Sequence, residues 1–310
     1  MKFIGLQTQI RRNNFRSILL LLAFPVLIFG LLYGITFFGT ESIDQANDMF
    51  IEFFPFVTVG VGVWFIIAYF SNTRMIKRQT KMHPLSRKEN MYIYNLTENL
   101  CMSVGMKMPK LFVIESNGLN AFASGINEKT FAVTITTGLI NHLNEKELEG
   151  VIAHELTHIR NNDVKLQIVA IIFVGIFSLI LEMLLRVTFQ SKRRSRRSKD
   201  DSGGGMIILI ALAFAAVGYF FSLLFRFALS RKREFLADAG AVELTKNAGA
   251  LASALRKISQ NPKVEVKNSG VKELFIDNGD RKKGFFSKLM GIFSTHPPIE
   301  DRIEILEKGI

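Results

Sequence analysis

Residues 143–163 read LNEKELEGVIAHELTHIRNND, a pattern typical of an amphipathic helix. Asn144 is a candidate N-cap, and Glu147 stands three residues later, at the position that a capping box requires. Beyond this start, apolar residues recur at helical spacing: Leu148, Val151, Ile152 and Leu156. The sequence therefore predicts a helix with one apolar side that carries the segment AHELTH.

His154 and His158 are four residues apart on this predicted helix, so both imidazoles project from one face. Two histidines at this spacing can bind one zinc ion, and Glu155 beside them can take a proton from a zinc-bound water. The same HExxH pattern arises by chance on the order of once per hundred chains of this length. Taken alone, the motif indicates either a zinc site or a helix that happens to carry two histidines.

A catalytic zinc site has three protein ligands and one position for water, so a third ligand must lie elsewhere in the chain. Residues 230–240 read SRKREFLADAG, in which Glu234 and Asp238 lie one helical turn apart. Glu234 can bind the metal, and Asp238 can hydrogen-bond a ligand histidine. The alternative is a solvated, charged helix end.

Residues 293–302, FSTHPPIEDR, are a further candidate for the reaction centre. His296 precedes two prolines, which are tolerated at the start of a helix, and Arg302 follows about one and a half turns later. A histidine or an arginine beside the zinc can stabilise a developing oxyanion. The alternative is a histidine in an ordinary turn.

Much of the remaining chain is apolar: 48% of its 310 residues are hydrophobic, and they concentrate in four blocks. A helix that spans a bilayer needs about 20 apolar residues. Block 166–181 is shorter, and it reaches that length only if Glu182 and Arg186 pair across one helical turn. A buried core helix is the alternative for this block. Three blocks contain no charged residue and are long enough to span: 17–40, 53–73 and 202–225.

The distribution of Lys and Arg predicts how the first two blocks cross the membrane. Basic residues cluster before the first block and after the second, whereas the loop between them, 41–52, contains none. The positive-inside rule places both flanks in the cytoplasm and this loop outside. The first block is too long for a removable signal peptide, so we expect it to remain as an anchor in the cell (inner) membrane.

Several other classes of protein are disfavoured. The net charge of +12 comes mainly from residues that flank apolar blocks, and no nucleic-acid-binding module is visible. No Gly-rich loop followed by Lys-Ser or Lys-Thr occurs, so no nucleotide-binding module is expected. The single cysteine, Cys101, excludes an internal disulfide and suits a reducing compartment. Nothing in the sequence specifies an oligomeric state.

The segment before the HExxH helix has the pattern of a small α+β domain. Residues 91–106 form an amphipathic helix that ends near Gly105, and three short strands follow: 110–116, 120–126 and 130–139. The strand that begins with Asn120, Ala121 and Phe122 is a candidate sheet edge, along which an extended peptide can pair. An ordinary edge without a ligand is the alternative.

Three motifs carry a resemblance to a known family. AHELTHIRNND, SRKREFLADAG and STHPPIEDR, in this order, resemble the membrane-embedded zinc metallopeptidases that include HtpX and the CAAX prenyl endopeptidases. The segments at 120–125 and 136–158 match that family's approach to the active site. The likeness runs from about residue 90 to 305. The length and the four apolar blocks are similar to HtpX, since the CAAX enzymes are longer and have more spans.

The resemblance implies a zinc endopeptidase that binds one Zn²⁺ per subunit through three residues: His154, His158 and Glu234. Glu155 would be the catalytic base, and Asp238 would support a ligand. His296 and Arg302 would sit at the reaction centre. The implied substrates are polypeptides, chiefly membrane or misfolded proteins, in membrane-protein quality control. The alternatives are a processing protease with one defined, for example prenylated, substrate and a zinc-stabilised membrane scaffold without turnover, against which Glu155 speaks.

The predicted fold is a mainly α, multi-pass membrane protein: four hydrophobic helices and a cytoplasmic α+β zincin-type protease domain with a small edge sheet. If the last two helices both cross the membrane, their basic loop, 190–205, lies outside and breaks the positive-inside rule. Crossing is still favoured because the last block is long and ends at Arg226, which can snorkel. A hairpin that does not cross is the alternative. The predicted segments are an N-terminal two-helix anchor at 1–73, catalytic parts at 74–164 and 230–310, and a transmembrane hairpin at 165–229.

Overall fold

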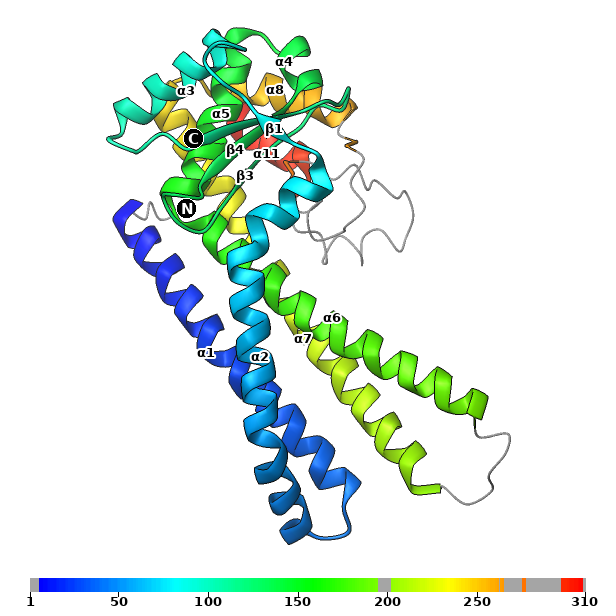
Figure 1. The fold of residues 1–310 in the computed structure, drawn as a ribbon. Coiled ribbons are helices and arrows are strands. Elements are labelled where there is room, and N and C mark those ends of the chain that lie inside the picture. The colour runs from blue at the N-terminus through cyan, green and yellow to red at the C-terminus, as the bar shows by residue number, and fades with distance from the viewer. Residues whose placement is uncertain (1–5, 195–201, 262, 265–274, 277–296, 309–310) are drawn as a thin grey trace. The chain divides into compact units, whose positions relative to one another are not determined.

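The computed structural model describes residues 6–194, 202–261, 263–264, 275–276 and 297–308 (Figure 1). The chain divides into two compact units, and each unit is built from segments that are far apart in the sequence. The first unit comprises Met1–Asn14, Ser71–Ile168 and Phe227–Ile310, and the second comprises Phe15–Phe70 and Val169–Arg226.

The second unit is built from four long helices: the C-terminal parts of α1 (Leu6–Gly39) and α6 (Asp163–Arg194) and the N-terminal parts of α2 (Ile43–Thr80) and α7 (Ser202–Thr245). Gly218 of α7 permits close packing, because a Cβ there would lie 2.5 Å from the Phe177 ring. Phe177 also meets Phe24 of α1 edge to face, with ring centroids 5.5 Å apart. Phe56 is 71% exposed and Phe70 is 75% exposed, as expected for helices whose outer faces contact lipid.

Two helices in the described part of the chain are long and apolar enough to cross a membrane, over Leu22–Gly39 and Ile43–Ser71. Each of these segments has a mean hydropathy of 2.0, and few of their residues are buried. A helix covers each of the four predicted blocks, but crossing by α6 and α7 stays a prediction. Residues 195–201 of the predicted basic loop lie outside the described residues.

The predicted loop 41–52 is wrong over most of its length, because α2 already begins at Ile43. Ser42 Oγ accepts a hydrogen bond from the Gln45 backbone N–H at 3.3 Å, and the Gln45 side chain accepts one from the Glu41 N–H. Ser followed three residues later by Gln is a helix-start signal that can be seen in the sequence. This helix-start signal outweighs the polar character of residues 41–52, and α2 therefore begins within them.

The first unit contains a four-stranded mixed sheet in the order β1-β2-β4-β3. β2 and β4 are parallel, whereas β1 pairs with β2 and β3 pairs with β4 in antiparallel fashion. The strand β3 therefore lies at one edge, as predicted. The bounds are His83–Pro84 for β1, Lys110–Ile114 for β2, Ala121–Ser124 for β3 and Ala132–Thr136 for β4.

Three of these strands were predicted, and each is shorter than its prediction, β4 most of all. The predicted strand 130–139 stops at Thr136, whose side chain caps α4 (Thr137–His142) by accepting a hydrogen bond from the Leu139 N–H at 3.2 Å. His142 is consequently the last residue of this helix. The short strand β1 was not predicted, because two residues carry no alternation pattern.

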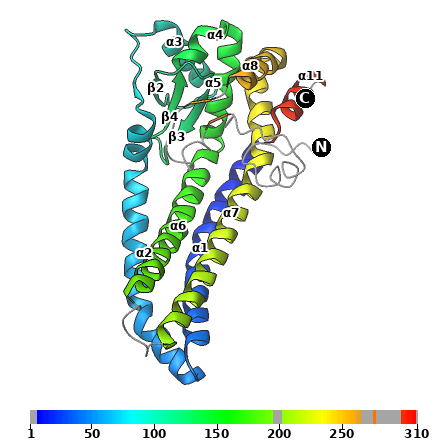
Figure 2. The same ribbon diagram turned by 90° about the vertical axis from the view of Figure 1, so that its right-hand side faces the viewer.

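Four further helices belong to this unit, as Figure 2 shows: α3 (Met91–Ser103), α5 (Glu145–Arg160), α8 (Ala248–Gln260) and α11 (Ile299–Lys308). α5 packs on the sheet, α3 and α8 contact α5, and α11 contacts α8. The capping box of α5 is confirmed, since Asn144 Oδ1 accepts from the Glu147 N–H and the Glu147 carboxylate accepts from the Asn144 N–H. α5 contacts both β3 and α8. A Cβ at Gly150 would lie 3.3 Å from the Leu251 Cα, so the glycine allows α8 to approach α5 closely.

Candidate metal centre

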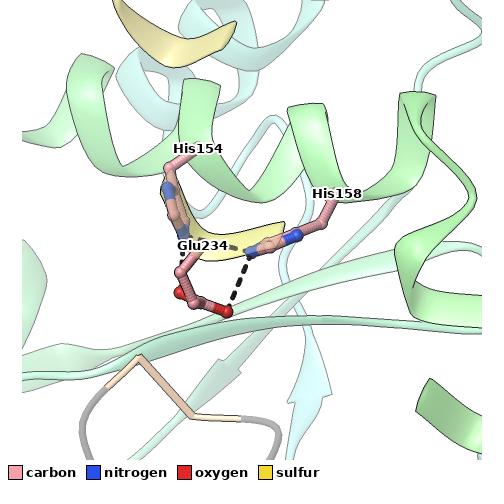
Figure 3. A group of neighbouring side chains, drawn as sticks. All are labelled: His154, His158 and Glu234. Atoms are coloured by element: carbon pink, nitrogen blue, oxygen red, sulfur yellow. Dashed lines mark hydrogen bonds and ion pairs between the residues drawn. The ribbon is translucent and has the colours of Figure 1, made fainter. Parts of the chain in front are cut away.

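The three predicted metal ligands come together in the structure (Figure 3). His154 and His158 lie on consecutive turns of α5, and Glu234 comes from α7. Ligand atoms from all three lie within 4.8 Å of one another. The two Nε2 atoms are 3.1 Å apart, and each is 3.6 Å from one carboxylate oxygen of Glu234.

The Nδ1 atom of each histidine faces a carboxylate. Asp238 Oδ1 lies 3.0 Å from Nδ1 of His154, and Asp163 Oδ2 lies 3.1 Å from Nδ1 of His158. A carboxylate accepts a hydrogen bond from Nδ1–H, which leaves the lone pair of a neutral imidazole on Nε2. Both lone pairs then point into one space beside Glu234. A cation between them would relieve their repulsion, and two histidines with one glutamate form a donor set that catalytic zinc uses.

The spacing and the charge of the cluster also fit a divalent ion. Two nitrogen ligands of a tetrahedral zinc stand about 3.3 Å apart, close to the 3.1 Å between the Nε2 atoms. Four carboxyl groups are buried around the cluster, against two guanidinium groups: Glu155, Asp163, Glu234 and Asp238, and Arg233 and Arg302. Unbalanced buried charge is costly, so this excess of carboxyl groups favours a bound cation.

Arg302 of α11 connects Asp238 to the ligand Glu234. Its Nε and Nη2 atoms donate to the two carboxylate oxygens of Asp238, at 2.8 and 2.6 Å, and Nη1 lies 3.1 Å from Glu234 Oε2. Arg302 is only 1% exposed. Burial opposes both charges, but their pairing outweighs it. The pairing of the two charges holds the pKa of Asp238 below its ordinary value and the pKa of Arg302 above its ordinary value.

The carboxylates of the cluster also favour a positive charge on His154. Burial alone would lower the pKa of His154, but hydrogen bonds with Asp238 and Glu234 outweigh burial and raise it to about 9. The cluster thus favours a positive charge on the imidazole side, which a proton or a metal ion can supply.

Comparison with known proteins shows the family to which the chain belongs. Residues 87–310 match the model of peptidase family M48. The chain belongs to peptidase family M48. It is 54% identical to a "Protease HtpX homolog" of Bacteroides fragilis, over 99% of this chain and 100% of the relative. Homologues with the same name share 39% identity in Dictyoglomus thermophilum, over 83% and 84% of the two chains, and 34% in Listeria monocytogenes, over 96% and 98%.

A solved structure has a similar fold. The crystal structure of S. mikatae Ste24p matches with a TM-score of 0.50 at 19% identity, over 94% of this chain and 67% of that chain. At this identity the likeness shows the fold alone. The family, the HtpX homologues and the apolar helices together make the chain a membrane-associated metallopeptidase.

In this M48 chain, Glu155 lies beside the histidines and is 3% exposed. Burial raises the pKa of Glu155 above its ordinary value, although the charges of His154 and His158 act in the opposite direction. A carboxylate whose pKa is raised is a stronger proton acceptor, which is what a general base requires. Glu155 borders a small cavity together with Ala123, His154, His158, Val164, Gln167, Glu234 and Ile276.

The remaining predicted site residues are Arg302, Asn120, Ala121, Phe122 and His296. Arg302 lies at the cluster, in contact with Glu234. Asn120 precedes β3, and Ala121 and Phe122 are its first two residues; all three are buried. His296 lies outside the described residues.

The sequence interpretation missed Asp163, although it ends the stretch AHELTHIRNND. A residue five positions after His158 does not share its helical face, so spacing alone gives no reason to pair them. Asn162 takes a left-handed conformation with φ +58°, and this turn brings Asp163 back toward the imidazole. The signal was the Asn-Asn pair, because asparagine tolerates this conformation better than most residues. The Asp163 carbonyl also accepts a hydrogen bond from Arg233, the neighbour of Glu234.

Proposed function

We propose that this chain is a zinc-dependent endopeptidase of the cell membrane that cleaves membrane or misfolded proteins as part of protein quality control. The observation that carries the proposal is a pair of histidines whose Nε2 atoms lie 3.1 Å apart beside Glu234. A carboxylate faces the Nδ1 atom of each histidine, and buried Glu155 lies next to them. A site that only stabilises structure has no need of a base in its cavity. Glu155 therefore favours turnover over a scaffold.

In this proposal His154, His158 and Glu234 hold one zinc ion. Zinc held by these residues would supply Lewis-acid chemistry at the scissile carbonyl and would lower the pKa of a bound water to about 7. Glu155 accepts a proton from the attacking water and gives it to the leaving amine.

Three further residues position these groups. Asp238 and Asp163 fix the histidine tautomers through their Nδ1–H groups, and Arg302 holds the carboxylates of Asp238 and Glu234. We further propose that His296 donates to the developing oxyanion. Arg302 is 1% exposed and donates two hydrogen bonds to Asp238, which favours a positioning role for it over direct contact with substrate.

The test of this function is metal-dependent proteolysis by the full chain, purified in detergent. Zinc-loaded protein should cleave fluorescein-labelled casein, and o-phenanthroline should stop cleavage until zinc is added back. Cleavage that persists after the metal has been removed, as verified by atomic emission, would contradict the proposal.

We also propose that the active site faces the cytoplasm, with catalytic parts at 74–164 and 230–310, an anchor at 1–73 and a hairpin at 165–229 that crosses twice. Ligands from both catalytic parts must lie on one side of the membrane, so the hairpin crosses an even number of times. A cysteine at Ser195, in a Cys101→Ser background, tests this arrangement in intact cells. We expect labelling by a membrane-impermeant thiol reagent; labelling only after the membrane is opened would contradict two crossings.

A further inference from the structure

The last turns of α2 have a buried side that packs into the unit containing the sheet. Ile76 and Thr80, four residues apart, are both buried, and the Thr80 hydroxyl donates to the Ile76 carbonyl at 2.9 Å. Just beyond the helix, the sulfur of buried Met82 accepts a hydrogen bond from the Thr134 hydroxyl of β4 at 3.4 Å. The part of α2 from Ser71 onward accordingly belongs to the same unit as the sheet.

The opposite side of this segment is basic. Four exposed residues form what we call the basic face: Arg74, Lys77, Arg78 and Lys81. The first three recur at helical spacing, on a side that is turned roughly 130° from Ile76 and Thr80, and Lys81 directly follows the last residue of the helix. No Asp or Glu occurs in residues 53–88, so none of the four has an acidic neighbour one helical turn away.

Toward the N-terminus of α2 the same side of the helix is apolar and exposed. Val63, Ile67 and Phe70 precede Arg74 and Lys77 at alternating spacings of four and three residues, so all five share one side of one continuous helix. Phe70 is the last residue but one of the segment that is long and apolar enough to cross a membrane. This side of α2 therefore changes from apolar to basic at the end of that segment.

An anionic phospholipid has the same two parts in the same order. Its acyl chains match exposed apolar side chains, and its phosphate accepts hydrogen bonds from guanidinium and ammonium groups. Basic residues beside a membrane span attract anionic lipids, and each one near the surface strengthens the attraction about fivefold. A nucleic acid or another soluble polyanion would match the cations but would leave the apolar residues before them without a partner. The combination favours a lipid.

We propose that the basic face binds the headgroups of anionic phospholipids, whose acyl chains lie along Val63, Ile67 and Phe70. The positive-inside rule concerns only the side of the membrane on which basic residues lie, and it requires no arrangement on one side of a helix. Lipid binding therefore goes beyond the predicted topology, and it does not depend on proteolysis. Because the basic face belongs to the same unit as the sheet and the metal-binding cluster, a bound lipid holds this unit to the membrane surface.

The single tryptophan of the chain, Trp64, is an internal probe for such a lipid. It adjoins Val63 and lies about 15 Å along the helix from Arg74, at a depth that the acyl chains of a bound lipid pass. The full chain is reconstituted into phosphatidylcholine vesicles that contain a rising fraction of mid-chain brominated phosphatidylglycerol or, in parallel, of brominated phosphatidylcholine, because bromine quenches nearby tryptophan fluorescence.

We expect brominated phosphatidylglycerol to quench Trp64 at a mole fraction at least about fivefold lower than brominated phosphatidylcholine does, since one basic residue near the surface contributes that much. The preference should disappear at about 1 M salt, where the Debye length is about 3 Å. This arm uses the wild-type chain and needs no substitution. Equal quenching by the two lipids at low salt would overturn the proposal.

Two variants with the same loss of charge show whether the basic face is responsible. The test variant carries four substitutions: Arg74→Gln, Lys77→Gln, Arg78→Gln and Lys81→Gln. The control variant replaces four other exposed lysines of the same unit with glutamine: Lys107, Lys110, Lys129 and Lys146. The test variant should lose the preference for phosphatidylglycerol, and the control should keep it. If both variants keep the preference, or both lose it, the basic face is not the lipid site.

Further variants keep the test valid if the fourfold change impairs folding, which circular dichroism in detergent would show. The pair Arg74→Gln, Arg78→Gln should weaken the preference, whereas Arg74→Lys, Arg78→Lys should retain it because the charge is unchanged. Equal preference in these two double variants would contradict the proposal.

A soluble polyanion is the other outcome to be separated. If the wild type binds fluorescein-labelled single-stranded DNA more tightly than the test variant does, while both are quenched equally by brominated phosphatidylglycerol, the basic face serves a soluble partner and the lipid proposal fails. Metal-dependent casein cleavage is measured independently, so the lipid site and the protease assignment can each fail without the other.

Discussion

The two ends of α5 carry buried polar groups of different kinds. At the N-terminal end, Glu147 accepts hydrogen bonds from Ser253 at 2.6 Å and from Lys257 at 2.7 Å, so one buried carboxylate meets one ammonium group. At the other end, His154 and His158 lie among more carboxyl groups than guanidinium groups. The charge at the first end is balanced by the protein itself, whereas the excess of carboxyl groups at the second end favours a bound cation. We therefore expect changes at the first end to affect stability and changes at the second to affect metal binding and catalysis.

The largest effect should come from removing the ligand that α7 supplies. Glu234→Ala leaves two histidines and an unbalanced Arg302, so both zinc content and casein cleavage should fall below detection. The control is Glu243→Ala, an exposed glutamate nine residues later on the same helix, which should behave as wild type. Stoichiometric zinc and normal cleavage in Glu234→Ala would remove this residue from the metal site.

A nearly equal loss of rate, without loss of metal, should follow from Glu155→Gln. The amide keeps the size of the side chain but cannot accept the proton, so kcat should fall by about 100- to 10,000-fold while zinc stays stoichiometric. Glu149→Gln, on the same helix and partly exposed, provides the comparison. Cleavage at the wild-type rate would show that another group is the base.

A smaller effect is expected at Asp163, which acts on the metal through His158. Asp163→Ala should weaken zinc affinity by about 10- to 100-fold, as measured by competition with a fluorescent chelator. Asp163→Asn keeps an acceptor for the Nδ1–H group and should lie between alanine and wild type. If all three proteins bind zinc equally, the contact with His158 has no role in metal binding.

Local patterns in the sequence were sufficient for the start of α5 and for its two histidines, and insufficient for the groups that surround these histidines. The capping box and the HExxH spacing involve residues within one or two helical turns, where geometry follows directly from spacing. The contact of Asp163 depends on a left-handed turn, and the place of Ile276 beside the cavity depends on contacts across the fold; no short period encodes either. Glu234 was found despite its distance in sequence because its motif has a chemistry that complements two histidines.

The smallest effect should appear at the balanced end of the helix. Burial works against the charged form of Glu147, but hydrogen bonds from Lys257, Ser253 and Asn144 outweigh it and hold the pKa of Glu147 below its ordinary value. A depressed pKa means that the ionised carboxylate stabilises the fold above pH ~4.5 and that this contribution disappears as the pH falls through the lowered value. Glu147→Gln should therefore lower the free energy of unfolding by about 1 kcal/mol at pH 7, with zinc content and kcat unchanged. Thermal melts in detergent should show the difference from wild type shrinking below pH 4.5, and a variant that loses zinc instead would show that the two ends of α5 are coupled.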